Sequence, residues 1–204
     1  MLTVILTGGR SRRMGRDKAT VPWEGGPACM TLAARYACLG PVAFSVAEKG
    51  RFPCGDYPEL PDAFPDAGPL NGLYSAFTQT EEETVFLTAT DLLMGDPELA
   101  QELLRRCGEH QGCAIRRTGG KMEPLFAIYK RSCLPAVEEA LNSGRKAMMR
   151  VYDSCNILAV DEKELDRWDL DRTLFNMNTP EDWILLNGAK KTEGSSDGKA
   201  QQME

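Results

Sequence analysis

Residues 2–18 read LTVILTGGRSRRMGRDK and divide into an apolar run, a pair of glycines and a basic segment. The run at 2–6 is short and rich in β-branched residues, which is typical of a buried strand. Gly8 and Gly9 end this run. Adjacent glycines let the backbone turn sharply and let another group approach the main chain closely. We therefore expect a strand followed at once by a tight glycine turn.

The segment after the glycines is strongly basic. It holds five bases and one acid, Asp17, in nine residues, a local charge of +4 in a chain whose net charge is −6. Backbone N–H groups of such a turn can surround an anion, while guanidinium and ammonium groups neutralise its charge. The combination favours a polyphosphate site over a merely solvated basic face. The spacing matches neither the P-loop nor the dinucleotide fingerprint G-x-G-x-x-G.

Residues 6–18, LTGGRSRRMGRDK, resemble the signature L-A-G-G-x-S-x-R-M-G-x-D-K of molybdenum cofactor guanylyltransferases, a family of the nucleotidyltransferase superfamily. Thr7 stands where that family usually has alanine. The related cytidylyltransferases resemble L-A-A-G at this point, so Gly8 and Gly9 favour the guanylyl branch. The resemblance runs in order over residues 2–187 and is most specific at its beginning.

Length and composition restrict the classes of protein to which the chain can belong. The chain has 204 residues, 42% of them hydrophobic, and no stretch approaches the ~20 apolar residues of a membrane span. The N-terminus enters a strand without a signal segment, so we expect a cytoplasmic protein that does not bind a membrane. Seven irregularly spaced cysteines without a C-x-x-C motif predict reduced thiols. A single histidine, His110, excludes histidine triads, and the negative net charge argues against nucleic-acid binding.

Apolar and amphipathic segments alternate along the chain. Strands are predicted at 2–6, 42–46, 84–90, 113–117, 124–129 and 156–160, and helices at 28–39, 69–78, from 97 onward, 132–142, 146–152 and 180–187. Pro124 predicts an edge or a strand end. The alternation predicts a mostly parallel α/β sheet with helices on both faces, and the resemblance implies the same three-layer Rossmann-like fold. We expect one nucleotidyltransferase domain over 1–188 and a disordered polar tail over 189–204.

Acidic residues follow the predicted strands, where ligands of such sheets bind. Asp91 comes directly after the run at 84–90, and Asp96 already supplies the cap of the next helix, so capping leaves Asp91 unexplained. The segment TATDL at 88–92 resembles the family's P-C-D-x-P, without its proline and cysteine. The resemblance implies that Asp91 binds Mg²⁺, which takes hard oxygen ligands from one or two carboxylates plus phosphates.

The resemblance also implies how GTP is held. Arg13 and Lys18 would bind its phosphates and, with Asp91, form the catalytic set. Residues 68–72, GPLNG, resemble the family's G-P-L-x-G stretch. Asp62 resembles the family's guanine-contacting aspartate, with Asp66 as a competing candidate because the gap from Asp62 to that stretch is one residue shorter here. Ser45 replaces a family asparagine. The implied nucleotide-binding residues are Leu6, Thr7, Gly8, Gly9, Gly15, Lys18, Ser45, Asp62, Gly68, Pro69, Leu70 and Asp91.

A late segment, FNMNTPED at 175–182, resembles the family's F-x-N-x-N-T-P-E-[DE]. Capping explains Thr179 onward but not Asn176 and Asn178, which the resemblance assigns to the acceptor. Residues 123–126 and 144–146 resemble weaker family segments, and the resemblance implies that they line a pterin pocket. For the bases at 145 and 146, a solvated patch is an equal interpretation.

The resemblance implies transfer of GMP from GTP to the phosphate of molybdopterin, with pyrophosphate as leaving group. A phosphate monoester with a second pKa near ~6 is largely deprotonated at neutral pH, so no general base is needed. Implied partners are GTP, molybdopterin or the molybdenum cofactor, molybdenum insertion proteins, and target molybdoenzymes or their chaperones. The alternatives are transfer from CTP, a sugar-phosphate acceptor, a GTP-binding regulator without turnover, and an RNA-binding module that uses the arginine loop.

Overall fold

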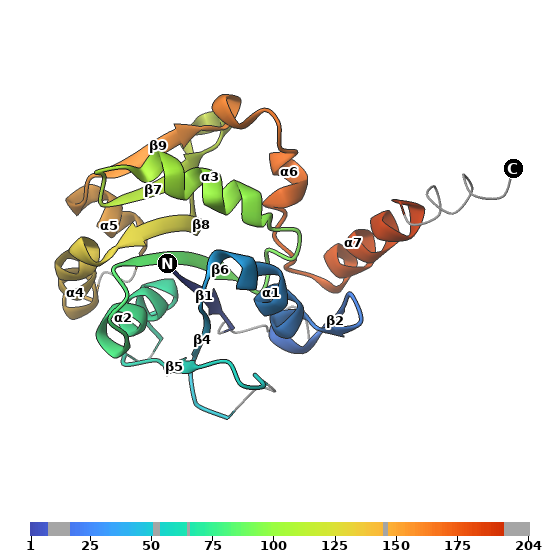
Figure 1. Ribbon diagram of the computed structural model, residues 1–204, viewed down its shortest axis with the longest axis horizontal. Coiled ribbons are helices and arrows are strands. Elements are labelled where there is room, and N and C mark those ends of the chain that lie inside the picture. Colours follow the sequence, from blue (N-terminus) through green and yellow to red (C-terminus); the bar gives the residue numbers. More distant parts are fainter. Residues whose placement is uncertain (8–16, 51–53, 65, 145–146, 194–204) are drawn as a thin grey trace, which may run out of the picture.

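The computed structural model describes residues 1–7, 17–50, 54–64, 66–144 and 147–193. A seven-stranded sheet runs through it in the order β5-β4-β1-β6-β8-β7-β9 (Figure 1). The strands are β1 (Leu2–Leu6), β4 (Val42–Val46), β5 (Glu59–Pro61), β6 (Thr84–Ala89), β7 (Gly112–Arg116), β8 (Met122–Lys130) and β9 (Ile157–Asp161). β8 is antiparallel to both its neighbours and the other pairs are parallel, which confirms the predicted mostly parallel sheet.

Helices cover both faces of this sheet. The α-helices are α1 (Ala28–Tyr36), α2 (Pro69–Gln79), α3 (Pro97–Cys107), α4 (Leu134–Asn142), α5 (Met149–Ser154), α6 (Leu170–Thr173) and α7 (Pro180–Glu193). Short 3₁₀ turns are η1 (Lys18–Thr20), η2 (Ala37–Leu39), η3 (Thr118–Gly120), η4 (Arg131–Cys133) and η5 (Glu162–Leu165), and a small hairpin joins β2 (Pro22–Trp23) to β3 (Gly26–Pro27). No helix in the described ranges is both long enough and apolar enough to cross a bilayer.

Two hydrophobic cores flank the sheet and explain its layers. α1 and α3 pack on one face, where Ile5 and Phe86 are buried, and α2, α4 and α5 pack on the other, where Val4 and Leu87 are buried. Because neighbouring strand residues point to opposite faces, a strand covered on both sides reads as a continuous apolar run. Each fully buried large apolar side chain contributes about 1.5–3 kcal/mol. The predicted three-layer α/β architecture is thereby confirmed.

The predicted helix starts have the expected caps. The amide of Glu98 donates to the Asp96 carboxylate (2.7 Å) at the start of α3. At the start of α7, the Asp182 amide donates to Thr179 Oγ1 (3.2 Å) and the Thr179 amide donates back to Asp182 Oδ2 (2.8 Å). These reciprocal bonds satisfy donors that a helix N-terminus otherwise leaves unpaired.

The strand β5 was not predicted, and it pairs with β4. Pro124 is the third residue of β8, before the pairing with β6 begins at Ala127 and where the register with β7 shifts, which agrees with the predicted position near a strand end. One local expectation was wrong. The helix α7 continues through Gly188 to Glu193 instead of ending near 187. The division into a domain at 1–188 and a tail at 189–204 stays a prediction.

Candidate active site

The carboxyl ends of three adjacent strands bring the predicted nucleotide site together. Leu6 at the end of β1 pairs with Ser45 of β4 on one side and Ala89 of β6 on the other. Thr7, the residue after β1, continues this pattern, because its amide and hydroxyl both donate to the Ser45 carbonyl (3.1 and 2.7 Å). Residues 8–16, the predicted glycine–arginine loop, follow in sequence. Its predicted site residues Gly8, Gly9, Arg13 and Gly15 lie outside the described residues.

The start of α2 forms one wall of this region. Gly68 precedes the helix with a φ of +61°, a conformation that favours glycine, and Pro69 occupies the first turn. Leu70 is fully buried, which gives it a packing role. At Gly72, a Cβ atom would lie 2.3 Å from Leu6 Cδ2 and 2.9 Å from Ser45 Oγ. Only glycine lets the helix approach both strands so closely, and the G-P-L-x-G pattern was the sequence signal for this residue.

Asp62, rather than Asp66, lies beside Ser45. Its amide donates to the Val46 carbonyl (2.8 Å), and Ser45 Oγ donates to its Oδ1 at 3.4 Å. Burial raises the pKa of the Asp62 carboxyl, and hydrogen bonds from Ser45 and Asn71 partly offset that rise. Asp66 is exposed in a turn with a φ of +53°. The structure therefore brings Asp62, and not Asp66, next to Ser45 at the predicted nucleotide site.

Lys18, Asp91 and Asn178 meet although they are far apart in sequence. Lys18 follows Asp17, whose carboxylate accepts the Ala19 amide (3.1 Å) and caps η1. Its Nζ donates to Asn178 Oδ1 (2.8 Å) and lies 3.6 Å from Asp91 Oδ2. The Lys18 and Asp91 side chains are only 17% and 22% exposed. Burial raises the pKa of Asp91, and the positive charge of Lys18 opposes that rise.

One of the two carboxylate oxygens of Asp91 makes no hydrogen bond to the described residues. This oxygen, Oδ1, is buried. Within those same residues, no group of three or more His, Cys, Asp or Glu side chains could hold a metal ion by itself. An orphaned carboxylate oxygen suits Mg²⁺ bound by one protein ligand together with phosphate oxygens and water. The residues present therefore fit the metal that the resemblance implies.

Two links hold the loop that carries Asp91. Arg35 of α1 donates to the carbonyls of Leu93 and Gly95 and forms an ion pair with Glu24 (2.8 Å). The Met177 amide donates to the Asp91 carbonyl (2.8 Å), which ties this loop to the segment containing the two asparagines. Arg35 was not predicted from the sequence, because no local pattern distinguishes it from a surface arginine.

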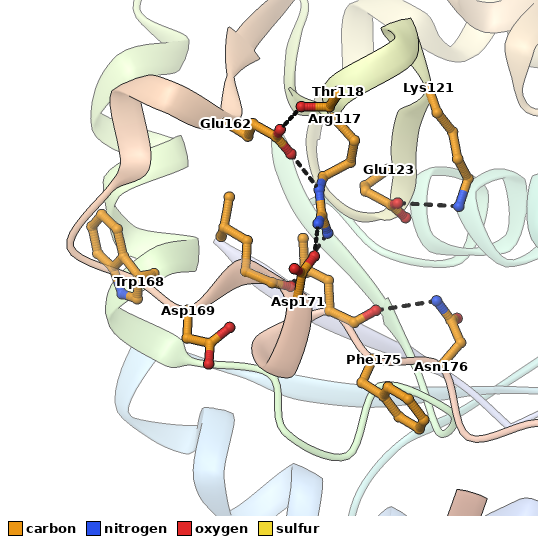
Figure 2. Close-up of a pocket in the computed structure, with 12 residues that line it drawn as sticks. Arg117, Thr118, Lys121, Glu123, Glu162, Trp168, Asp169, Asp171, Phe175 and Asn176 are labelled. Atoms are coloured by element: carbon orange, nitrogen blue, oxygen red, sulfur yellow. Dashed lines mark hydrogen bonds and ion pairs between the residues drawn. The ribbon is translucent and has the colours of Figure 1, made fainter.

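A pocket of about 750 Å³ is lined in part by residues 174–176 of that segment (Figure 2). The aromatic side chains of Trp168 and Phe175 line this pocket, and Asn176 lines it as well. Arg117 crosses the pocket and is held by Glu162 (2.7 Å) and by Asp171. The Glu123 side chain is only 12% exposed and pairs with Lys121 (3.2 Å).

The two predicted acceptor asparagines therefore lie in different surroundings. Asn176 lines the pocket and donates to the Leu174 carbonyl (3.2 Å), whereas Asn178 binds Lys18. Glu123 belongs to a segment expected at the pterin pocket, and the residues at 145 and 146 lie outside the described ranges. Arg117 and Trp168 were not predicted from the sequence, because they belong to no motif and reach the pocket only through the tertiary fold.

Comparisons with known proteins show what this chain resembles. The chain is 30% identical over 200 residues to a probable molybdenum cofactor guanylyltransferase of Pelotomaculum thermopropionicum, covering 96% of this chain and 95% of the relative. It is 30% identical over 197 residues to the molybdenum cofactor guanylyltransferase of Pseudomonas entomophila, covering 87% and 93%. The solved structure of molybdopterin-guanine dinucleotide biosynthesis protein A from Archaeoglobus fulgidus superposes with a TM-score of 0.81 at 20% identity, covering 94% of this chain and 100% of that one.

A family model assigns the chain to a protein family. The model described as the MobA-like NTP transferase domain matches residues 3–159, which include the whole nucleotide region described above. The match covers well over half of the chain, and the two curated relatives extend the similarity beyond it. The predicted family and enzyme class are thereby confirmed: the chain is a nucleotidyltransferase and belongs to the MobA-like NTP transferase family.

Proposed function

We propose that this chain transfers GMP from GTP to the phosphate of molybdopterin, forming the guanine dinucleotide cofactor and pyrophosphate. One observation carries the proposal: Lys18, Asp91 and Asn178 meet at the carboxyl ends of the strands, with an orphaned Asp91 oxygen facing no partner among the described residues. The names of the curated relatives support the same donor and acceptor. A cytoplasmic location and contacts with insertion proteins or target enzymes stay predictions.

The chain's own residues supply position and charge. Lys18 holds the donor phosphates, with Arg13 of the glycine–arginine loop as its predicted partner. Asp91 would hold Mg²⁺, which when bound neutralises phosphate charge. The acceptor phosphate needs no general base because it is largely deprotonated at neutral pH. The rate enhancement then comes from alignment and from fixed positive charge near the reacting phosphorus.

The acceptor's pterin would occupy the pocket in Figure 2. A pterin is flat and polar at its edges, and the pocket offers the aromatic side chains of Trp168 and Phe175 together with the amide of Asn176. Asn178 is tied to the Asp91 region in two ways. Its Oδ1 accepts from Lys18 Nζ, and it directly follows Met177, whose amide donates to the Asp91 carbonyl. The segment 176–178 would thus connect the donor and acceptor halves.

Thermal unfolding tests donor choice. The protein is heated with GTP, CTP, ATP or UTP, each with and without Mg²⁺, and a ligand at ~100 times its dissociation constant adds about 2.7 kcal/mol. We expect the largest stabilisation from GTP with Mg²⁺. A preference for CTP would assign the sister cytidylyl activity. If GTP stabilises the protein but no pyrophosphate is released in the presence of molybdopterin, the chain is a GTP-binding regulator without turnover. If no nucleotide stabilises the protein, the proposal is contradicted.

A further inference from the structure

The acidic side chains in the pocket of Figure 2 are not equally engaged by the protein. Four acids line this pocket: Glu123, Glu162, Asp169 and Asp171. Glu162 and Asp171 are both bonded to Arg117, and Asp169 caps the N-terminus of α6. Glu123 takes part in neither arrangement, although its side chain is the least exposed of the four, at 12%.

Within the described residues, Glu123 has one hydrogen-bond partner, the Lys121 ammonium. The Nζ of Lys121 lies 3.2 Å from Glu123 Oε1, and no described residue bonds Oε2. The Lys121 side chain is 71% exposed, so water screens this ion pair and it holds the carboxylate weakly. A carboxylate that is mostly removed from water is costly unless strong donors bind it. A ligand that donates two hydrogen bonds would supply what Glu123 lacks.

The backbone places Glu123 and Lys121 next to each other. They are two residues apart where the chain enters β8, and side chains at that spacing on an extended backbone lie on the same face. The preceding turn is fixed, because the Gly120 amide donates to the Arg117 carbonyl (2.9 Å) and the Arg117 amide donates to the Lys121 carbonyl (2.8 Å). Acceptor oxygens and an ammonium donor thus lie side by side at the pocket wall (Figure 2).

The same pocket has an aromatic wall that is held in place. The Arg167 guanidinium lies over the Trp168 ring, 4.2 Å from its centroid, and pairs with Glu98 of α3 (2.7 Å). Trp168 and Phe175 both line the pocket that contains Glu123. A flat ring can pack on an aromatic side chain while its polar edge reaches a carboxylate. The lining therefore suits a flat heteroaromatic ring with donors along one edge.

The edge of a pterin matches this pair group by group. The pyrimidinone half of a pterin carries, in order, an amino group, a ring N–H and a carbonyl oxygen. A carboxylate accepts from two adjacent donors at once, and a neighbouring ammonium donates to the carbonyl oxygen. A ring with a carbonyl in place of the amino group would instead set one acceptor against another. The pair can therefore select one ring over the other.

We propose that Glu123 is a specificity-determining residue for the acceptor: its carboxylate accepts from the amino group and ring N–H of the pterin, and Lys121 donates to the carbonyl oxygen. This inference rests on the proposed function, because that function supplies the pterin. Guanine carries the same edge, but the base of GTP is assigned to Asp62 beside Ser45. The pocket that contains Glu123 is thus left for the acceptor.

The test compares the affinities of pterin and lumazine, which has a carbonyl in place of the amino group. Probe fluorescence is titrated in the presence of saturating GTP and Mg²⁺, so that the base side is occupied. We expect the unaltered chain to bind pterin at least about tenfold more tightly, the effect of one hydrogen bond to a charged group. Glu123→Gln keeps the shape but turns one acceptor into a donor that suits the lumazine carbonyl. We expect lumazine to become the preferred probe.

Two further variants serve as controls. Asp169→Asn removes one negative charge from the same pocket, and asparagine still caps α6, so the preference for pterin should not change. Lys121→Met removes the donor to the carbonyl oxygen that both probes share. It should weaken both by about three- to tenfold and keep their ratio. Because Lys121 is mostly exposed, this variant tests the inference even if Glu123→Gln fails to fold.

Four outcomes would overturn the inference: an unchanged preference for pterin in folded Glu123→Gln, an equal change in Asp169→Asn, unchanged affinities in Lys121→Met, or binding of neither probe by the unaltered chain. Guanosine that binds the GTP-saturated chain more tightly than pterin would also overturn it, by assigning the pocket to guanine.

Thermal unfolding of the same samples separates this inference from the proposed function. If GTP with Mg²⁺ stabilises the unaltered chain and the probes show no preference, only the inference fails. If GTP does not stabilise the chain, the proposed function itself fails, whatever preference the probes show.

Discussion

The base side and the phosphate side of the candidate site are built differently. Around Asp62 the polar groups are paired: Ser45 Oγ donates to the carboxylate, and the Asp62 amide donates to the Val46 carbonyl. Around Asp91 one carboxylate oxygen has no hydrogen-bond partner within the described chain, while Lys18 Nζ lies 3.6 Å from the other oxygen and donates to Asn178 Oδ1. The base side is thus set before a ligand arrives, whereas the phosphate side keeps an unbonded carboxylate oxygen for one. Recognition favours a fixed carboxylate, and catalysis favours charge that the ligand completes.

The largest expected effect comes from Asp91→Asn, which removes the charge and keeps the shape. We expect turnover to fall by about 10³-fold, the size seen when one charge-stabilising group is lost. Because burial raises the pKa of Asp91, its ionised form is costly in the fold, and the variant should unfold at the same or a higher temperature. Asp96→Asn is the control, since asparagine also caps a helix well. Lower stability with normal turnover would contradict this account of the phosphate side.

Lys18→Ala should have the next largest effect, about 10²-fold on turnover, because it removes phosphate neutralisation and leaves Asp91 without its positive neighbour. Steady-state kinetics at varied GTP concentration measure the change. Lys49→Ala, on an exposed loop, provides the comparison. Equal kinetics for the two variants would show that Lys18 serves only structure.

Arg35→Ala tests the support of the Asp91 loop. The substitution leaves the carbonyls of Leu93 and Gly95 without their donor, so we expect a loss of about 1–2 kcal/mol in unfolding free energy. The Mg²⁺ concentration for half-maximal nucleotide binding should rise about tenfold, since the loop then holds Asp91 less firmly. Arg105→Ala, on the exposed side of α3, should change neither quantity. A stability loss without a change in metal dependence would restrict Arg35 to folding.

The smallest expected effect concerns pH on the base side. An ionised Asp62 accepts from guanine, and a protonated one cannot accept from both donors. Because burial raises the pKa of this carboxyl, discrimination between GTP and inosine triphosphate should begin to fall, on acidification, at a higher pH than the ~3.9 of an ordinary aspartate would give. Affinities measured across a pH series check this. Discrimination that persists down to ~pH 4 would assign guanine recognition to another group.

The same contrast explains what the sequence could predict. The strand at 2–6, the caps at Asp96 and Thr179, and the unexplained Asp91 depend on neighbours within a few residues, and local patterns reveal them. Arg35, Asn71 and the Arg117 network depend on partners brought together by the fold, so no local pattern marks them. The strand β5 escaped prediction for the same reason, since its pairing with β4 is a tertiary contact.

The most direct measurement follows the α-phosphate of GTP into product. The purified chain is incubated with Mg²⁺, molybdopterin and GTP labelled at the α-phosphorus, alone and with an excess of unlabelled CTP, and Asp91→Asn is run in parallel. We expect the label to join molybdopterin, pyrophosphate to appear in equal amount, CTP to compete only weakly, and the variant to transfer almost no label. Transfer abolished by CTP, or pyrophosphate release without a labelled pterin product, would contradict the proposed function.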